Sequence, residues 1–291
     1  MAESPEPVFG RRAFVVGAAA VGAGIAIVGC GLFDDDGPDR IAYGTAPSQF
    51  GELYEPDTPP PWPVVVTMHG GSWKNGESLS FMEDNCSDLR RRGYAVWNIE
   101  YRRVGEFGGG FPGTLDDVGA AVDHLQVLAQ DRSLALDRVA VLGHSAGGTL
   151  ALWAGARPTL PAGAPGAAPV IVPVAALSLA GVTDLAACAQ EGLIAGACPQ
   201  FLGGMPAERP ERYALVSPIE RVPLGLPQVV VHGRDDNVVP LAQSERYAAA
   251  AAQAGDTVDL EVVDGANHFT IVEVDQPAWA LVVDALDRLQ I

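Results

Sequence analysis

The segment Val139-Ala-Val-Leu-Gly-His-Ser-Ala-Gly-Gly-Thr-Leu-Ala-Leu-Trp-Ala-Gly155 carries the strongest local signal in the sequence. An apolar run at 139–142 predicts a buried strand, and an Ala-rich run at 149–156 predicts a helix. The turn between them, Gly143-His144-Ser145-Ala146-Gly147, has the form G-x-S-x-G. A sharp strand-to-helix turn of this form presents its serine at the edge of a sheet, because small flanking residues let strand and helix pass closely. We therefore predict that Ser145 is a nucleophile at a helix N-terminus and not an incidental turn residue.

Strands and helices alternate along most of the chain. Buried or alternating apolar runs predict strands at 64–68, 94–99, 139–142, 174–179, 228–232 and 258–263, with helical patterns between them and at 279–289. Two short strands at 41–44 and 50–55 are expected to form an antiparallel edge. This alternation predicts an α/β fold in which a mostly parallel central sheet is covered by helices on both faces.

Three polar positions follow the carboxyl ends of predicted strands. They are Ser145, the pair Asp235 and Asp236, and His268. Ligands of open parallel sheets bind at this edge. The chain order Ser, Asp, His suggests a nucleophile, a carboxylate and a base, with either aspartate available to orient the histidine.

The strand at 64–68 runs into His69-Gly70-Gly71-Ser72-Trp73. Two glycines after a buried strand allow the backbone to turn its N–H groups toward a ligand. We interpret this loop as part of an oxyanion hole, the simpler alternative being a tight turn with a core tryptophan. In the later loop 100–113, we expect Arg102 and Arg103 to be solvated charges, the alternative being that they line a site.

With these motifs together, the chain from residue 41 to its end resembles the α/β-hydrolase superfamily. It is most similar to the esterase and arylformamidase-like branch that carries an H-G-G-x-W motif. The matching motifs are His69 to Trp73, Gly143 to Gly148, His232-Gly233 through Asp236 to Val239-Pro240, and Asn267-His268-Phe269.

The resemblance implies the α/β-hydrolase fold and a role for each site residue. Ser145 attacks a carbonyl carbon, His268 transfers the proton, and a carboxylate orients His268. The H-G-x-x-D-x-x-V-P pattern assigns that carboxylate to Asp236 and leaves Asp235 as a loop residue. Resemblance to hormone-sensitive-lipase-like enzymes adds the N–H groups of Gly71 and Ser72 to that of Ala146 as oxyanion donors.

These features predict a serine hydrolase that cleaves carboxylic esters, with small acyl groups expected. The alternatives are an amidase, either arylformamidase-like or a short-peptide hydrolase, and an inactive hydrolase fold used for binding. No Cys/His spacing suggests zinc, and no cofactor is expected. The formal net charge of −18 argues against a nucleic-acid partner, and the oligomeric state stays open.

The first residues have the pattern of an export signal. Arg11-Arg12 precedes a short Gly/Ala-rich apolar run, which predicts a signal peptide over 1–29 of the twin-arginine kind. Ile27-Val-Gly-Cys30 resembles a bacterial lipobox, so we expect Cys30 to be lipidated and to anchor the protein to the extracytoplasmic side of the cell membrane. A secreted protein with a plain cleaved signal is the alternative. The segment 30–40 is a tether, and 41–291 is the catalytic domain.

A segment at 185–212 has weak periodicity and interrupts the alternation. We interpret it as a lid-like insertion whose apolar side chains Leu193, Ile194, Phe201, Leu202 and Met205 roof the pocket. Cys188 and Cys198 form its natural disulfide in an oxidising compartment, the alternative being two buried free thiols.

Overall fold

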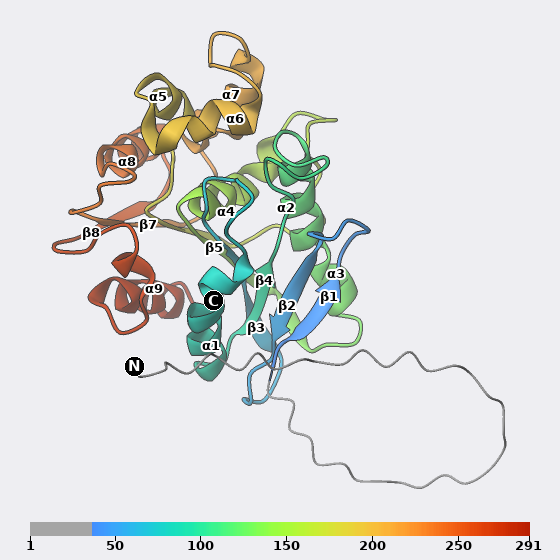
Figure 1. Ribbon diagram of the computed structural model, residues 1–291. Helices are drawn as coiled ribbons and strands as arrows, with labels where there is room; N and C mark the ends of the chain where they lie inside the picture. Colours follow the sequence, from blue (N-terminus) through green and yellow to red (C-terminus); the bar gives the residue numbers. More distant parts are fainter. Residues whose placement is uncertain (1–36) are drawn as a thin grey trace, which may run out of the picture. The chain divides into compact units, whose positions relative to one another are not determined.

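The computed structural model describes residues 37–291, so the predicted signal 1–29, Cys30 and most of the tether lie outside the described residues. The described chain is built on one eight-stranded sheet with the order β1-β2-β4-β3-β5-β6-β7-β8 (Figure 1). The strands are β1 (Asp39–Ala42), β2 (Phe50–Tyr54), β3 (Trp62–Met68), β4 (Ala95–Ile99), β5 (Leu134–His144), β6 (Ala175–Leu179), β7 (Gln228–Gly233) and β8 (Val258–Val263). The pairs β1–β2 and β2–β4 are antiparallel and all others are parallel, as expected from the sequence.

Alternating side chains of the central strands feed two separate cores. In β3, Val64 and Val66 belong to one core and Val65 to the other, because successive strand residues point to opposite faces. Both faces are therefore apolar, which explains why these strands read as continuous hydrophobic runs.

Helices cover both faces and bury these two cores, which confirms the predicted architecture. The first core lies under α2 (Gly113–Asp123), α3 (Leu125–Leu128), α4 (Ala146–Ala156) and α8 (Ala242–Ala254). The second lies under α1 (Glu83–Arg91) and α9 (Pro277–Arg288). None of the helices within residues 37–291 is long and apolar enough to cross a membrane.

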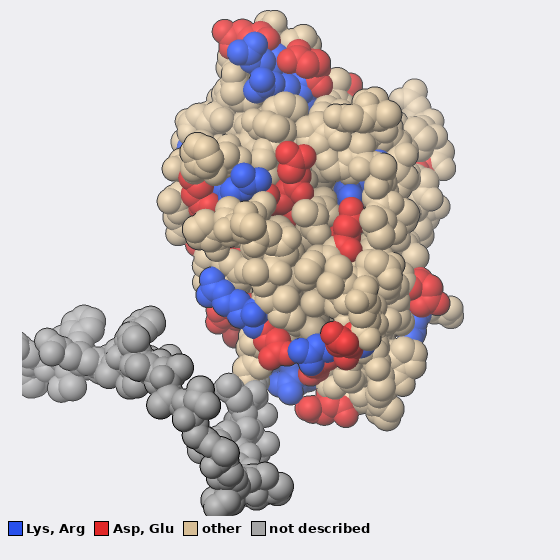
Figure 2. Space-filling model, turned by 90° about the vertical axis from the view of Figure 1, so that its right-hand side faces the viewer, with Lys and Arg blue, Asp and Glu red and all other residues tan. Residues whose placement is uncertain are grey.

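Surface charges are mixed in sign. The sequence has 36 acidic side chains and 18 cationic ones. On the face drawn in Figure 2, Lys and Arg lie beside Asp and Glu, and broad areas carry neither. Arg132, for example, contacts both Asp39 and Glu55. Exposed pairs of this kind contribute little to stability, so the two cores and not the surface charges hold the fold together.

The turn from β5 into α4, residues 143–147, is called the elbow below, and it depends on glycine. A Cβ atom on Gly143 would collide with the carbonyl oxygen of Gly147, and one on Gly147 would collide with the carbonyl oxygen of Met68 in β3. The backbone of the turn therefore touches both its own helix and the neighbouring strand. Ser145 takes the strained value φ = 54° in this turn.

The segment 185–212 forms a cluster of short helices at the carboxyl edge of the sheet (Figure 1). These are α5 (Leu185–Gln190), the 3₁₀ turn Leu193–Gly196, and α6 (Ala197–Leu202), and α7 (Pro210–Val216) follows. Phe201 and Leu202 are buried in the first core, whereas Met205 is exposed. Phe201 stacks on Trp73 with ring centroids 4.6 Å apart. An apolar side chain of the segment 185–212 thus packs against the loop after β3.

Replacing Gly147 by Ala is expected to destabilise the protein by about 2–3 kcal/mol, because the new methyl group must displace β3 or α4. Denaturant unfolding of Gly147→Ala measures the loss. Gly37→Ala is the matched control, since a Cβ atom at Gly37 meets no atom within 4 Å. Equal stability of the two variants would show that the elbow tolerates a side chain.

The predicted bridge in the insertion can be tested by counting thiols. Cys188 and Cys198 are free thiols in the structure, both fully buried, with sulfur atoms 2.6 Å apart. We expect these two thiols to form a disulfide on oxidation. In oxidised, unfolded Cys30→Ser protein, only Cys86 is then expected to react with a thiol reagent. Reduction is then expected to lower stability by about 2–3 kcal/mol, the cost of opening a loop of about ten residues. Three reactive thiols would contradict the bridge.

Candidate active site

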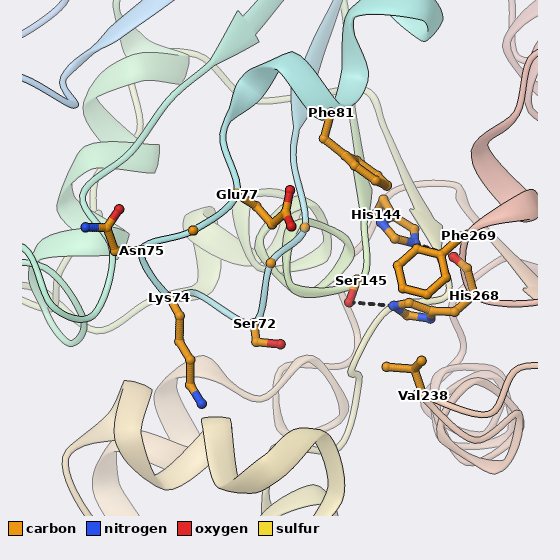
Figure 3. A pocket seen from close by; sticks show the side chains of 13 residues that line it. Ser72, Lys74, Asn75, Glu77, Phe81, His144, Ser145, Val238, His268 and Phe269 are labelled. Atoms are coloured by element: carbon orange, nitrogen blue, oxygen red, sulfur yellow. Dashed lines mark hydrogen bonds between the residues drawn. The ribbon is translucent and has the colours of Figure 1, made fainter. Parts of the chain in front are cut away.

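A cavity of about 370 Å³ opens at the carboxyl edge of the sheet (Figure 3). Its wall combines the loop after β3, the elbow after β5 and the loops after β7 and β8. The lining residues are Gly70, Gly71, Ser72, Lys74, Asn75, Gly76, Glu77, Phe81, His144, Ser145, Val238, His268 and Phe269. Within residues 37–291 no three His, Cys, Asp or Glu side chains are arranged to hold a metal ion.

Ser145 and His268 meet in this cavity. Ser145 is 5% exposed, and its Oγ lies 3.0 Å from Nε2 of His268. The N–H of Ser145 donates to the carbonyl oxygen of Leu179 in β6, at 2.8 Å, which fixes the strained turn to the sheet. Residues 123 positions apart in the chain are thus brought into hydrogen-bond contact by the strand order β5-β6-β7-β8.

Asp236 completes this chain of hydrogen bonds. Its Oδ2 lies 2.7 Å from Nδ1 of His268, and its Oδ1 accepts from the N–H groups of Val238 and Val239 at 2.8 Å. Burial raises the pKa of this carboxyl, but hydrogen bonds from His232, His268 and the Val238 N–H outweigh burial and hold the pKa well below its usual range. Asp236 is therefore an ionised acceptor that sets the tautomer of His268.

The neighbouring aspartate plays no part in this arrangement. Asp235 is exposed, and among the described residues its side chain has no hydrogen-bond or ion-pair partner. His232 lies behind Asp236, with Nε2 2.9 Å from the Val239 carbonyl oxygen and 3.4 Å from Oδ2 of Asp236. The structure thus brings Asp236, and not Asp235, to His268.

His144 supports the backbone of His268. Its Nε2 lies 2.8 Å from the carbonyl oxygen of His268, and its ring packs between Phe81 and His268. Burial and the nearby His268 lower the pKa of His144 to about 3. A neutral His144 therefore donates from Nε2, and the second imidazole in the cavity adds no charge next to His268.

Two hydrogen bonds hold the backbone of the loop after β3, whose residues Gly71 and Ser72 line the cavity. The Gly70 carbonyl oxygen lies 2.7 Å from Nδ1 of His69, and the Gly71 carbonyl oxygen accepts from the N–H of Lys74 at 3.0 Å. In a trans peptide the C=O and N–H point in opposite directions. The N–H groups of Gly71 and Ser72 therefore point away from the two nitrogen atoms that hold these carbonyls, Nδ1 of His69 and the backbone nitrogen of Lys74. Residues 71–73 all have positive φ, from 55° to 103°.

The third predicted donor is the N–H of Ala146, at the start of α4. The Ser145 carbonyl oxygen accepts from Thr149 at 3.2 Å, along the helix, so the Ala146 N–H points back out of the helix end. Gly70 connects the two parts, because a Cβ atom there would lie only 3.2 Å from Cβ of Ser145. The loop after β3 and the elbow thus lie directly side by side.

The cavity has an apolar side and a polar side. Phe81, Val238 and Phe269 lie around His268, whereas Lys74, Asn75 and Glu77 lie across Ser145 from it (Figure 3). No residue of 185–212 lines the cavity, which differs from the expectation that this segment roofs the pocket. The apolar residues of the segment are used instead for packing against Trp73 and the core.

The expectation for the two arginines in the loop after β4 is wrong. Arg102 and Arg103 are not solvated charges, because Arg102 contacts the fully buried Asp117 and Arg103 is only 8% exposed. Glu100, for which the sequence predicts no role, is buried against His69. Its position immediately after a strand, at the same edge as Ser145, was the available signal.

The comparisons with solved structures agree with this fold. A truncated carbohydrate esterase from gut microbiota superposes with a TM-score of 0.75 and 20% identity, covering 88% of this chain and 98% of its own. Esterase 2 of Thermogutta terrifontis, phosphoramylated by tabun, gives a TM-score of 0.69 and 22% identity, with 87% and 93% covered. An acetyl ester-xyloside bifunctional hydrolase from Caldicellulosiruptor lactoaceticus gives 0.68 and 21%, with 87% and 93% covered.

At these identities the likeness concerns the fold, and it confirms the α/β-hydrolase architecture. No curated protein matches the chain significantly. The BD-FAE family model matches residues 52–250, which is more than half of the chain and includes both Ser145 and Asp236. The protein therefore belongs to the BD-FAE family.

Proposed function

We propose that this protein is a serine hydrolase that cleaves carboxylic esters. The observation that carries the proposal is the continuous line of hydrogen bonds from Ser145 Oγ through His268 to Asp236, at 3.0 and 2.7 Å. These distances lie within the reach required of a nucleophile, its base and the orienting carboxylate. The solved structures with the same fold include esterases, which supports an ester as the bond cleaved.

In this mechanism Ser145 Oγ attacks the carbonyl carbon of the ester, and Nε2 of His268 accepts the hydroxyl proton. Asp236 stabilises the imidazolium that forms and holds its ring in place. His268 then donates the proton to the departing alcohol, leaving an acyl group on Ser145. Water, deprotonated by His268, attacks this acyl group and releases the carboxylic acid.

The negative oxygen formed in each step accepts hydrogen bonds from the N–H groups of Ala146, Gly71 and Ser72. Such preorganised donors stabilise the transition state more than the substrate, because charge develops on the oxygen only during the reaction. The carbonyl oxygen in each of these three peptides accepts a hydrogen bond, which supports donors with a fixed orientation.

The shape of the cavity supports a small acyl group and a polar leaving group. Phe81, Val238 and Phe269 form an apolar wall beside His268, whereas Lys74, Asn75 and Glu77 offer charged and hydrogen-bonding groups on the other side. We assign the acyl group to the apolar side and the sugar of an acylated carbohydrate to the polar side. Two structural neighbours, a carbohydrate esterase and an acetyl ester-xyloside bifunctional hydrolase, support this class.

An active-site probe and a substrate panel test the proposal. A fluorophosphonate is expected to label the protein at Ser145, and Ser145→Ala is expected to abolish both labelling and hydrolysis while the fold remains intact. Acetyl and butyryl esters are expected to be hydrolysed faster than N-formyl and aminoacyl amides. Preference for the amides would make the protein an amidase, and absence of labelling would make it an inactive binding protein.

The two neighbouring aspartates give a matched pair of variants. Asp236→Asn is expected to lower kcat by about 10⁴, because an amide favours the wrong tautomer of His268. Asp235→Asn changes an exposed carboxyl of the same loop, and its kcat is expected to stay within about threefold of the unmodified protein. Steady-state kinetics on one ester decide between them, and the reverse ranking would contradict the assignment of Asp236.

A further inference from the structure

Glu100 is a buried carboxylate just behind the loop that carries the oxyanion donors. It follows the last residue of β4 and is 3% exposed. Its Oε1 lies 2.9 Å from Nε2 of His69 and accepts from the N–H of Tyr101 at 3.0 Å, and its Oε2 accepts from the N–H of Leu79 at 3.1 Å. One carboxylate therefore holds the beginning and the end of the loop 69–79.

His69 has an oxygen atom next to each ring nitrogen. Nδ1 lies 2.7 Å from the Gly70 carbonyl oxygen, and Nε2 lies 2.9 Å from Oε1 of Glu100. Both oxygens are acceptors when Glu100 is ionised. A neutral imidazole has only one N–H, so it would direct a lone pair at one of these oxygens. With Glu100 ionised, the two hydrogen bonds form together only when His69 is an imidazolium.

The charge of that imidazolium is balanced inside the protein. His69 is fully buried and stacks on Tyr101, with ring centroids 4.4 Å apart. Burial raises the pKa of Glu100, but the His69 hydrogen bond and charge, together with Arg103, outweigh burial and keep the pKa below its usual range. A buried charge is costly without a partner, and His69 and Glu100 provide one for each other.

The consequence reaches the reacting centre through one peptide. The Nδ1–H of His69 holds the Gly70 carbonyl, and the N–H of Gly71 in the same trans peptide points the opposite way, from a residue that lines the cavity. Without that bond the Gly70–Gly71 peptide is free to rotate, because neither residue has a side chain to restrain it.

We propose that Glu100 is a positioning residue that keeps His69 protonated and thereby fixes the Gly71 N–H as an oxyanion donor. This inference rests on the proposed function, because it assigns a role in the same reaction. Arg103 supports the same loop, since it donates to the carbonyl oxygen of Glu77 and lies 3.4 Å from Oε1 of Glu100. Residues 100–104 thus support the loop 69–79, which carries Gly71 and Ser72.

Two variants separate the hydrogen bonds from the charge. Glu100→Ala removes both, and we expect kcat on an acetyl ester to fall by about 10², the loss expected for one oxyanion donor, with KM changed less than about threefold. Glu100→Gln keeps an oxygen for the Leu79 N–H and offers an N–H to a neutral His69. Its kcat is expected to fall by less than about tenfold.

Binding of a transition-state mimic provides a readout that a general loss of stability does not move. A trifluoromethyl ketone forms a tetrahedral adduct with the serine, and its affinity is expected to fall in parallel with kcat in Glu100→Ala. Asp123→Asn is the matched control. Asp123 is the last residue of α2, and its ion pair with the buried Arg157 lies outside the lining of the cavity. The control is expected to lose stability but to keep kcat and inhibitor affinity.

The charge of His69 is measured directly by ¹⁵N NMR of histidine-labelled full-length protein at pH 8. An imidazolium signal that is absent from His69→Gln and becomes neutral in Glu100→Gln supports the proposal. A neutral His69 in the unmodified protein overturns it. So does a folded Glu100→Ala variant that keeps kcat or inhibitor affinity within threefold. Failure of the unmodified protein to hydrolyse any ester contradicts the proposed function instead, and the NMR result still decides the charge of His69.

Discussion

Close backbone contact at the elbow between β5 and α4 is the constraint on which the rest of the site depends. Gly147 lies against the carbonyl oxygens of Met68 and His69, and Gly143 lies against Gly147 itself. This contact sets the strained conformation of Ser145, aims the N–H of Ala146 and brings the loop after β3 beside the nucleophile. A larger residue at either glycine would separate three elements of the site at once, because they share the same few ångströms of backbone.

Two buried carboxylates then organise the two halves of the site in similar ways. Asp236 accepts hydrogen bonds from His268 and from backbone N–H groups, and Glu100 accepts from His69 and from backbone N–H groups. The free-energy cost of removing a carboxylate from water is offset only when several hydrogen-bond donors replace the lost hydration. Each of these two carboxylates has at least three such donors. Complete partnering of this kind holds a site in one geometry, which suits catalysis better than an apolar core that can repack.

The sequence alone determined the sheet, the elbow and the order of the polar strand ends. Hydrophobic runs, a G-x-S-x-G turn and the positions of the Asp235/Asp236 pair and His268 are local patterns, and each depends on residues adjacent in the chain, whereas the choice of Asp236 came from the family resemblance. The α/β architecture and the expected site residues could therefore be predicted from it. The comparisons bear out the architecture, and the structure brings Ser145, Asp236 and His268 within hydrogen-bond distance.

Only the tertiary structure decided which side chains meet. The segment 185–212 packs Phe201 on Trp73 and does not roof the cavity, because a stacked aromatic pair is set by three-dimensional packing and has no periodic signature. Arg103 and Glu100 look like loop charges in the sequence, yet both are buried. Burial and hydrogen-bond partners are properties of contacts between residues distant in the chain, such as His69 and Glu100, so they emerge only when the strands assemble.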